Sequence, residues 1–287
     1  MSARYNYLIS DSKGMDLPIY DDHFHVSPSG LNVEAMRQFK AAGGTGMTLV
    51  TLPYPEVRIT CGEDFRKSFR ITTEYARQGR ELGLEINCAI GPYPILLPYL
   101  SEHMGIEKAE QALMEGMRIA HGMIVSGEAQ LMGEVGRPHF ETDQRYVDAC
   151  NRVLQYGMDL AHENDYAVMI HCESWDDTFR SLSEMAREAG LPARKVIKHS
   201  SPPLVTEEET FGVTPSIPCS RTLIREALSK GDNFMVETDY IDDPQKPGAM
   251  MSLNTVPKRI KGFHQSGEMS EDLIVKICRE IPRSLYS

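Results

Sequence analysis

The stretch Ile19-Tyr20-Asp21-Asp22-His23-Phe24-His25-Val26 decides between two α/β architectures for this chain. It is short, largely apolar at its ends and closes on His-Phe-His, so we interpret it as a first β-strand with a polar carboxyl end. A doubly wound open sheet usually carries a glycine-rich phosphate loop after that strand. No GxGxxG motif follows here. The sequence therefore favours the other architecture, a (β/α)₈ barrel.

Seven further segments are also short, nearly continuously apolar and mostly bounded by polar residues, glycine or proline. Continuous apolarity is typical of parallel strands that are buried on both faces. With the first segment, the predicted strands are Ile19–Val26, Gly46–Pro53, Glu85–Pro92, Ala129–Gly136, Ala167–Glu173, Lys195–Ser200, Gly212–Cys219 and Asn233–Ile241. Eight such strands with helices between them predict a single TIM-type barrel domain over residues 1–287, because these barrels take about 250 residues.

Helices are predicted between most of the strands. Thr142–Asn164 and Ile106–Met123 carry apolar residues at spacings of three and four, which gives each an apolar stripe. Thr206–Thr210 allows only a short helix. Ser270 can cap a final helix that runs through Ile277.

The composition is that of a globular protein. Charged residues make up 25 % and hydrophobic residues 41 %, which excludes a disordered chain. No apolar run approaches the roughly 18 residues that a membrane span needs. Met1–Gly14 lacks the features of a secretion signal, and the six cysteines include no CxxC pair. We therefore expect a cytoplasmic protein with reduced thiols and no membrane partner.

The net charge is −11, from 30 lysines and arginines against 41 aspartates and glutamates. A protein that binds nucleic acid mainly through phosphate contacts usually shows a basic face. The acidic balance is more typical of a soluble protein that binds metal.

Histidines and carboxylates stand at the carboxyl ends of five predicted strands. His23 and His25 are two residues apart on a strand, so both imidazoles can aim at one point. A lone HxH is a weak sign of a metal site, since a structural pair is more common. In a barrel, however, all the strand ends meet on one face. The full candidate ligand set is His23, His25, Glu134, His171, His199 and Asp239.

This set matches a two-metal site, in which a bound water has its pKa lowered to about 7. Imidazoles and carboxylates suit Zn²⁺ or Mn²⁺, with Mg²⁺ as an alternative, and the sequence does not choose between them. A one-metal deaminase site draws on much the same residue types. Such a site needs a further acid–base residue, and Glu134 is the candidate for it.

The ordered series of HxH, Gly133-Glu134-Val135-Gly136, His171, His199 and Thr238-Asp239 resembles the TatD-type branch of the amidohydrolase superfamily. The resemblance spans nearly the whole chain, and it implies a TIM-type barrel and a divalent-metal hydrolase. It further implies that one metal is held by His23, His25 and Asp239 and the other by His171 and His199. Glu134 would bridge the two metals, and Asp239 would also take a proton from the attacking water.

Three loops depart from the pattern of TatD-type deoxyribonucleases. Many of these enzymes have an arginine two positions after the strand-five histidine, where this chain has Glu173 in the acidic segment 171–177. The segments 137–140 and 200–203 also differ from the family. Phosphate oxygens favour charge-assisted donors, so an acidic rim would repel a polyanion.

Other residues near these strand ends carry alternative interpretations. Arg137 and His139 are candidate substrate contacts, although Arg137 can equally pair with an acid of the rim. Trp175 is a candidate floor for the substrate pocket or a packed anchor for its loop. Lys198 precedes His199 on its strand and is expected to point the other way, in a structural role.

The sequence therefore predicts a TatD-type hydrolase that uses a metal-activated water on a phosphoester or a small ester or amide, with deoxyribonuclease activity kept open. The expected partner is a small-molecule or nucleic-acid-end substrate, with no protein partner indicated and the oligomeric state undetermined. One alternative is a deaminase or amidohydrolase with a single metal. The second is a metal-binding scaffold without catalysis.

Overall fold

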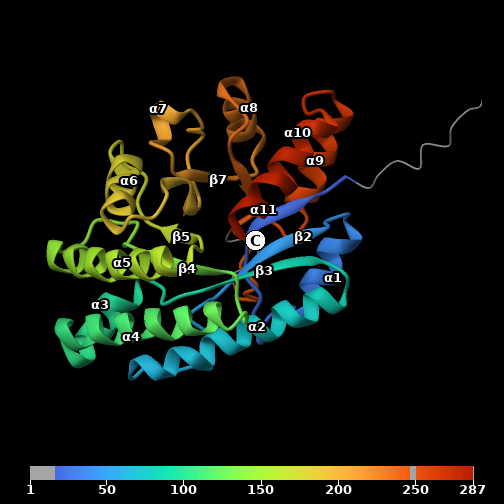
Figure 1. The fold of residues 1–287 in the computed structure, drawn as a ribbon. Helices are drawn as coiled ribbons and strands as arrows, with labels where there is room; N and C mark the ends of the chain where they lie inside the picture. Colours follow the sequence, from blue (N-terminus) through green and yellow to red (C-terminus); the bar gives the residue numbers. More distant parts are fainter. Residues whose placement is uncertain (1–16, 246–249, 287) are drawn as a thin grey trace, which may run out of the picture.

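Eight parallel strands form the centre of the protein (Figure 1), whose structure is a computed structural model that describes residues 17–245 and 250–286. Met1–Gly14, where a secretion signal was not expected, lies outside the described residues. Each predicted strand segment contains one strand, over a narrower range. The strands are β1 (Tyr20–Phe24), β2 (Gly46–Val50), β3 (Glu85–Ile90), β4 (Leu131–Gly136), β5 (Val168–His171), β6 (Val196–Lys198), β7 (Thr214–Pro218) and β8 (Met235–Glu237).

The strands pair in chain order from β1 to β8, and the two ends of the sheet meet. Phe24 forms a parallel bridge with Tyr240, just beyond β8. The backbone N–H of His25 donates a hydrogen bond of 2.8 Å to the carbonyl of Tyr240. The sheet therefore closes into a nearly complete barrel, whose strand ends face one opening. This confirms the (β/α)₈ prediction and excludes the doubly wound sheet.

Helices cover the outside of the barrel (Figure 1). They are α1 (Val33–Ala41), α2 (Phe65–Glu81), α3 (Leu96–Met104), α4 (Ile106–Val125), α5 (Gln144–Asn164), α6 (Thr178–Ala189), α7 (Glu207–Thr210), α8 (Arg221–Lys230), α9 (Thr255–Gln265), α10 (Glu271–Val275) and α11 (Ile281–Tyr286). Short 3₁₀ turns occupy Gly62–Asp64 and Ala193–Lys195.

The predicted helices are present with shifted ends. α5 begins at Gln144 rather than Thr142 because the side chain of Asp143 caps it, accepting a hydrogen bond of 2.9 Å from the N–H of Arg145. Ser270 caps α10, as predicted. That helix ends at Val275, short of Ile277, and a π-helical turn follows it.

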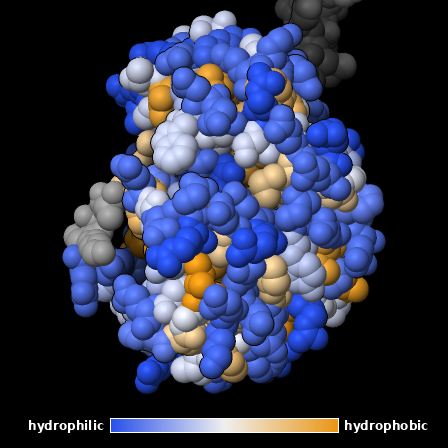
Figure 2. Space-filling view, turned by 90° about the vertical axis from the view of Figure 1, so that its left-hand side faces the viewer, coloured by the Kyte–Doolittle hydropathy of each residue, from blue (hydrophilic) through white to orange (hydrophobic). Residues whose placement is uncertain are grey.

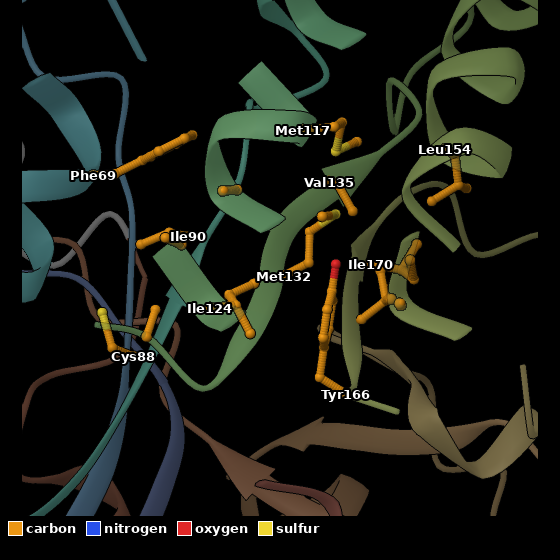
Figure 3. Packing of buried hydrophobic residues seen from close by; sticks show 14 of the residues in the cluster. Phe69, Cys88, Ile90, Met117, Ile124, Met132, Val135, Leu154, Tyr166 and Ile170 are labelled. Carbon is orange, nitrogen blue, oxygen red and sulfur yellow. The ribbon is translucent and has the colours of Figure 1, made fainter. Parts of the chain in front are cut away.

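Buried apolar side chains fix the helices against the strands. In Figure 3, Met132 and Val135 of β4 and Ile170 of β5 lie among Met117 of α4 and Leu154 of α5. All five side chains are almost completely buried. Fully burying one such side chain contributes about 1.5–3 kcal/mol to folding. This packing holds the ends of β4 and β5 in fixed positions relative to each other.

One face of the molecule is largely polar (Figure 2). Figure 2 shows a face covered mostly by hydrophilic residues, with apolar residues in small separate spots. Within residues 17–245 and 250–286, no helix has the length and apolar character to cross a membrane. All six cysteines are free, and Cys61 alone among them is exposed.

Candidate metal centre

A β-bulge in β1 directs the two histidines of the HxH motif into the barrel. The register of β1 against β2 shifts between Asp21 and Phe24. A bulge adds a residue to one strand and so reverses which side chains face inward beyond it. His23 and His25 lie at and after this shift, and their Nε2 atoms approach to 3.1 Å.

β4 carries a second bulge at the candidate bridging carboxylate. Its register against β5 shifts between Met132 and Val135, the interval that contains Glu134. Just beyond, Gly136 has a φ of 137°, and a Cβ atom there would lie 2.1 Å from the carbonyl oxygen of His171. Only glycine fits this close approach of β4 to β5. The close approach brings Glu134 next to the strand-five histidine.

The first group of donor atoms comes from β1 and the end of β8. Asp239 Oδ1 lies 3.4 Å from Nε2 of His25 and 3.8 Å from Nε2 of His23. All three residues are buried, and their donor atoms lie within 4.8 Å of one another. This spacing is short enough for all three atoms to share one cation.

The second group surrounds Glu134. Its Oε2 lies 3.0 Å from Nε2 of His23, and its Oε1 lies 2.9 Å from Nδ1 of His171. Nε2 of His199 lies 3.0 Å from the same Nδ1 and 3.7 Å from Glu134 Oε2. The barrel therefore brings together all six candidate ligands, which are far apart in the sequence.

Burial and close charges set the protonation of the centre. Burial alone would raise the pKa of Glu134, but His171 and His199 lower it well below its usual range. The pKa of Asp239 is also lowered, because the hydrogen bond from His25 and the charge of His23 outweigh burial. Burial would lower the pKa of His23, yet Glu134 raises it to about 10. Both carboxylates are therefore ionised at neutral pH.

The surrounding hydrogen bonds orient the histidines for metal binding. Nδ1 of His25 donates to the carbonyl of Val50 at 2.9 Å, which directs Nε2 toward the centre. Nδ1 of His199 lies 3.5 Å from Oε1 of Glu237, a buried carboxyl. A hydrogen-bonded outer partner fixes the tautomer of an imidazole, as the carbonyl of Val50 does for His25. The donor set of imidazole nitrogens and carboxylate oxygens fits divalent transition metals.

Asp239 is held in position by the first strand. The carboxylate of Asp21 accepts hydrogen bonds from the N–H of Thr238 at 2.9 Å and from its hydroxyl at 2.7 Å. Asp239 itself has a φ of 49°, a left-handed conformation that aspartate tolerates better than most residues. Such conformations persist where the surroundings fix the backbone. The hydrogen bonds that Thr238 donates to Asp21 supply this support, and they join the two ends of the sheet.

The sequence profile of the family described as TatD related DNase matches residues 20–287. The chain belongs to this family. A protein of Methanocaldococcus jannaschii, named only as uncharacterized protein MJ1127, is 31 % identical to it over 274 residues, which cover 94 % of this chain and 96 % of the relative. The family resemblance predicted from the sequence is confirmed, and membership of the TatD family makes the protein a metal-dependent hydrolase.

Solved structures share the fold of this TatD-family chain. The TatD homologue YJJV of Escherichia coli K12 is 18 % identical with a TM-score of 0.66, covering 95 % of this chain and 99 % of its own. A mutant organophosphorus hydrolase from Deinococcus radiodurans is 15 % identical with a TM-score of 0.61, covering 94 % and 93 %. The phosphotriesterase homology protein of Escherichia coli, with phosphate in its active site, is 12 % identical with a TM-score of 0.62, covering 95 % and 99 %.

Arg137, a candidate substrate contact, is buried beneath the mouth of the TatD-family barrel. Its guanidinium donates to both carboxylate oxygens of Glu173, at 2.6 and 3.2 Å, and also to Asn151 and Ser181. The side chains of Arg137 and Glu173 are each only 7 % exposed. Arg137 therefore forms an ion pair with an acidic residue, which is the alternative interpretation of its role. The prediction that Glu173 adds charge to the rim is wrong, because this ion pair neutralises it below the surface.

Glu173→Gln is expected to lower the free energy of unfolding by about 3–5 kcal/mol, because it leaves the buried charge of Arg137 without a partner. The double variant Arg137→Met/Glu173→Met should recover most of this loss. Urea denaturation of the variants measures both effects. Glu81→Gln, which breaks an exposed pair with Arg77, is the control and should change little. A double variant as unstable as the single one would contradict the assignment.

The other residues singled out near the strand ends, two predicted substrate contacts and one predicted structural residue, differ in position. His139 is exposed at the mouth of the barrel, with Nδ1 2.7 Å from Nε2 of His171. Trp175 is 61 % exposed, so its indole is neither a pocket floor nor a packed anchor. Lys198 is buried outside the centre, as its strand position predicted, and donates to the carbonyl of His199 at 2.7 Å.

Sequence reasoning missed three residues that contact or support the TatD-family centre. Tyr93, after β3, has its hydroxyl 3.5 Å from Nε2 of His171. The buried Asp21 supports Asp239 through Thr238, and the buried Glu237 has its Oε1 3.5 Å from Nδ1 of His199. Asp21 stands two residues before His23, and Glu237 stands two residues before Asp239. An acidic residue so close to a predicted ligand was the sequence signal for both.

Proposed function

We propose that the protein hydrolyses a phosphoric or carboxylic ester, or an amide, with its six candidate ligands holding two divalent cations. Zn²⁺ and Mn²⁺ suit the donor set best, with Mg²⁺ as an alternative. The observation that carries the proposal is the position of Glu134, whose Oε2 faces His23 and whose Oε1 faces His171. A carboxylate with one oxygen toward each ligand group is suited to bridge two cations.

The residues of this chain supply binding and proton transfer. When bound, the cations would polarise the substrate and lower the pKa of the attacking water. The carboxylate of Asp239 accepts a proton from that water, since its lowered pKa keeps it ionised at neutral pH. The water oxygen then forms the new bond to phosphorus or to the carbonyl carbon. The bond to the leaving group breaks, and Asp239 returns the proton to that group.

A phosphodiester at a DNA end is the second candidate substrate, because the family carries the description DNase. The charge at the mouth favours a less anionic substrate. Arg137 is bound to Glu173, while Asp176 and Asp177 are exposed on the same loop. Among the described residues, the loop after β5 therefore offers no free charge-assisted donor for several phosphates.

The test combines metal content with turnover. Protein freed of metal by a chelator is expected to be inactive and to regain hydrolysis on loading with Mn²⁺ or Zn²⁺. Elemental analysis should then find about two ions per chain. The substrates to compare are small carboxylic esters, lactones, simple phosphodiesters and single-stranded DNA.

The outcomes separate the hypotheses. About one tightly bound ion per chain would favour the single-metal deaminase or amidohydrolase instead. Two ions without turnover of any of these substrates would argue for the scaffold without catalysis. Turnover of DNA alone would identify the second candidate substrate as the correct one.

A further inference from the structure

A cavity of about 610 Å³ lies between the loop after β2 and the segment from β3 through α3. Volumes of this size are typical of small-molecule sites. Its walls are mainly apolar and aromatic. They include Tyr54, Ile59, Phe65, Leu96, Tyr99 and Leu100.

The cavity adjoins the metal centre. Tyr93 lines it and also has its hydroxyl 3.5 Å from Nε2 of His171. Thr51 lines it as well, directly after Val50, whose carbonyl accepts the hydrogen bond from His25. One wall of the cavity is thus continuous with the residues that hold two of the ligands. None of the six candidate ligands lines the cavity itself, so an arm of a molecule bound at the centre would reach it past Tyr93.

The residues of the cavity walls determine the chemical character of an arm that can bind there. Phe65 and Leu100 are each 2 % exposed and form a buried apolar surface. The hydroxyl of Tyr54 is bonded to Thr72 at 3.0 Å, so its ring is what remains to contact a ligand. Among the described residues, no carboxylate lines the cavity, and Arg58 and His103 are exposed on it. Most of the lining residues therefore offer apolar contact, and Arg58 and His103 are the lining residues that can carry a positive charge.

We propose that this cavity binds an uncharged, largely apolar arm of the substrate, attached next to the bond that is hydrolysed. The inference rests on the proposed function for the reaction, and it narrows the substrate class to small hydrophobic esters. A polynucleotide is disfavoured, since successive phosphates need several charge-assisted donors and, among the described lining residues, Arg58 and His103 alone could supply them. Apolar surface moved from water onto these walls would instead gain the hydrophobic free energy of burial.

A chain-length series tests the arm. For the Mn²⁺-loaded protein acting on 4-nitrophenyl esters from acetate to octanoate, kcat/KM is expected to rise about three- to fourfold per added methylene until the cavity is filled. Ile59→Asn and Tyr99→Ser should reduce this rise to less than about twofold per methylene. Tyr99 is 58 % exposed, so its variant should fold normally. Val125→Ser, an exposed apolar position at the end of α4, is the matched control and should keep the full rise.

A binding measurement separates the cavity from the reaction. The uncharged fluorophore N-phenyl-1-naphthylamine is expected to bind the metal-free protein, with a Kd raised at least about fivefold in Ile59→Asn and Tyr99→Ser but not in Val125→Ser. Fluorophore binding with this variant pattern, without ester turnover, would support the cavity while the proposed function fails. Equal fluorophore binding in all variants, or a flat chain-length series in an active enzyme, would overturn the inference.

Discussion

Asp239→Asn is expected to lower kcat roughly 10²–10⁴-fold at saturating Mn²⁺, the range for loss of a positioned proton acceptor. The wild-type carboxylate is ionised at neutral pH because His25 and His23 lower its pKa. An amide of the same shape cannot accept the proton of the attacking water. Steady-state kinetics on the best ester, with elemental analysis of the same sample, measures the effect.

The metal content decides how that loss is interpreted. Asp239 also belongs to the first group of donor atoms, so the comparison is made at Mn²⁺ concentrations that restore two ions per chain. Asp176→Asn removes an exposed carboxylate from the loop after β5 and is the control, which should keep wild-type kcat. If Asp239→Asn with both ions bound turned over at the wild-type rate, the proton would have to leave by another group.

The barrel could be predicted from the sequence because its signal is repeated along the chain. Eight short apolar segments separated by helical patterns leave few other architectures, and their order alone determines which strand ends are neighbours. The ends of two strands differ from the prediction. β6 and β8 end two and four residues before the predicted ends, Ser200 and Ile241, so His199 and Asp239 follow these strands rather than lying in them.

The direction of the ligands depends on bulges, which the alternation of residues along a strand does not reveal. Without the register shifts, simple alternation would place His23 on the same side as Asp21, which instead bonds to Thr238. At Glu134 the shift against β5 has the same effect. The residue types at the strand ends predict that the six ligands converge. The geometry that makes them converge comes from the register between neighbouring strands.

The pairing of Arg137 with Glu173 was also outside what local sequence can decide. The two residues follow different strands, and either could have faced the solvent. Their ion pair forms because the close approach at Gly136 brings the loops after β4 and β5 together over the buried start of α6. The sequence shows Glu173 only as an acidic residue in the loop after β5. Its contact with Arg137 in the structure shows that its charge is neutralised.

Glu134→Gln is expected to abolish binding of the second metal ion and to lower hydrolysis to near the rate without metal. The amide carries no charge and cannot bridge two cations, while the ligands on either side stay in place. In metal-free protein the same change should cost about 3–5 kcal/mol of unfolding free energy at neutral pH, because it removes the anionic partner of buried His23. Elemental analysis and urea denaturation measure the two effects.

The pH dependence of that stability difference follows from the two pKa values. His23 has a raised pKa of about 10, so its pairing stabilises the fold at neutral and lower pH and is lost as the pH rises through about 10. Glu134 has a lowered pKa, so its contribution is lost only under acidic conditions, well below its usual range. The gap between wild type and Glu134→Gln should therefore be widest between the ordinary pKa values of the two groups, about 4.5 and 6.5, shrink as the pH rises toward 10 and stay narrow above it. Glu141→Gln, an exposed carboxylate in the next loop, should show no such gap, and a gap that did not change with pH would contradict the pairing of Glu134 with His23.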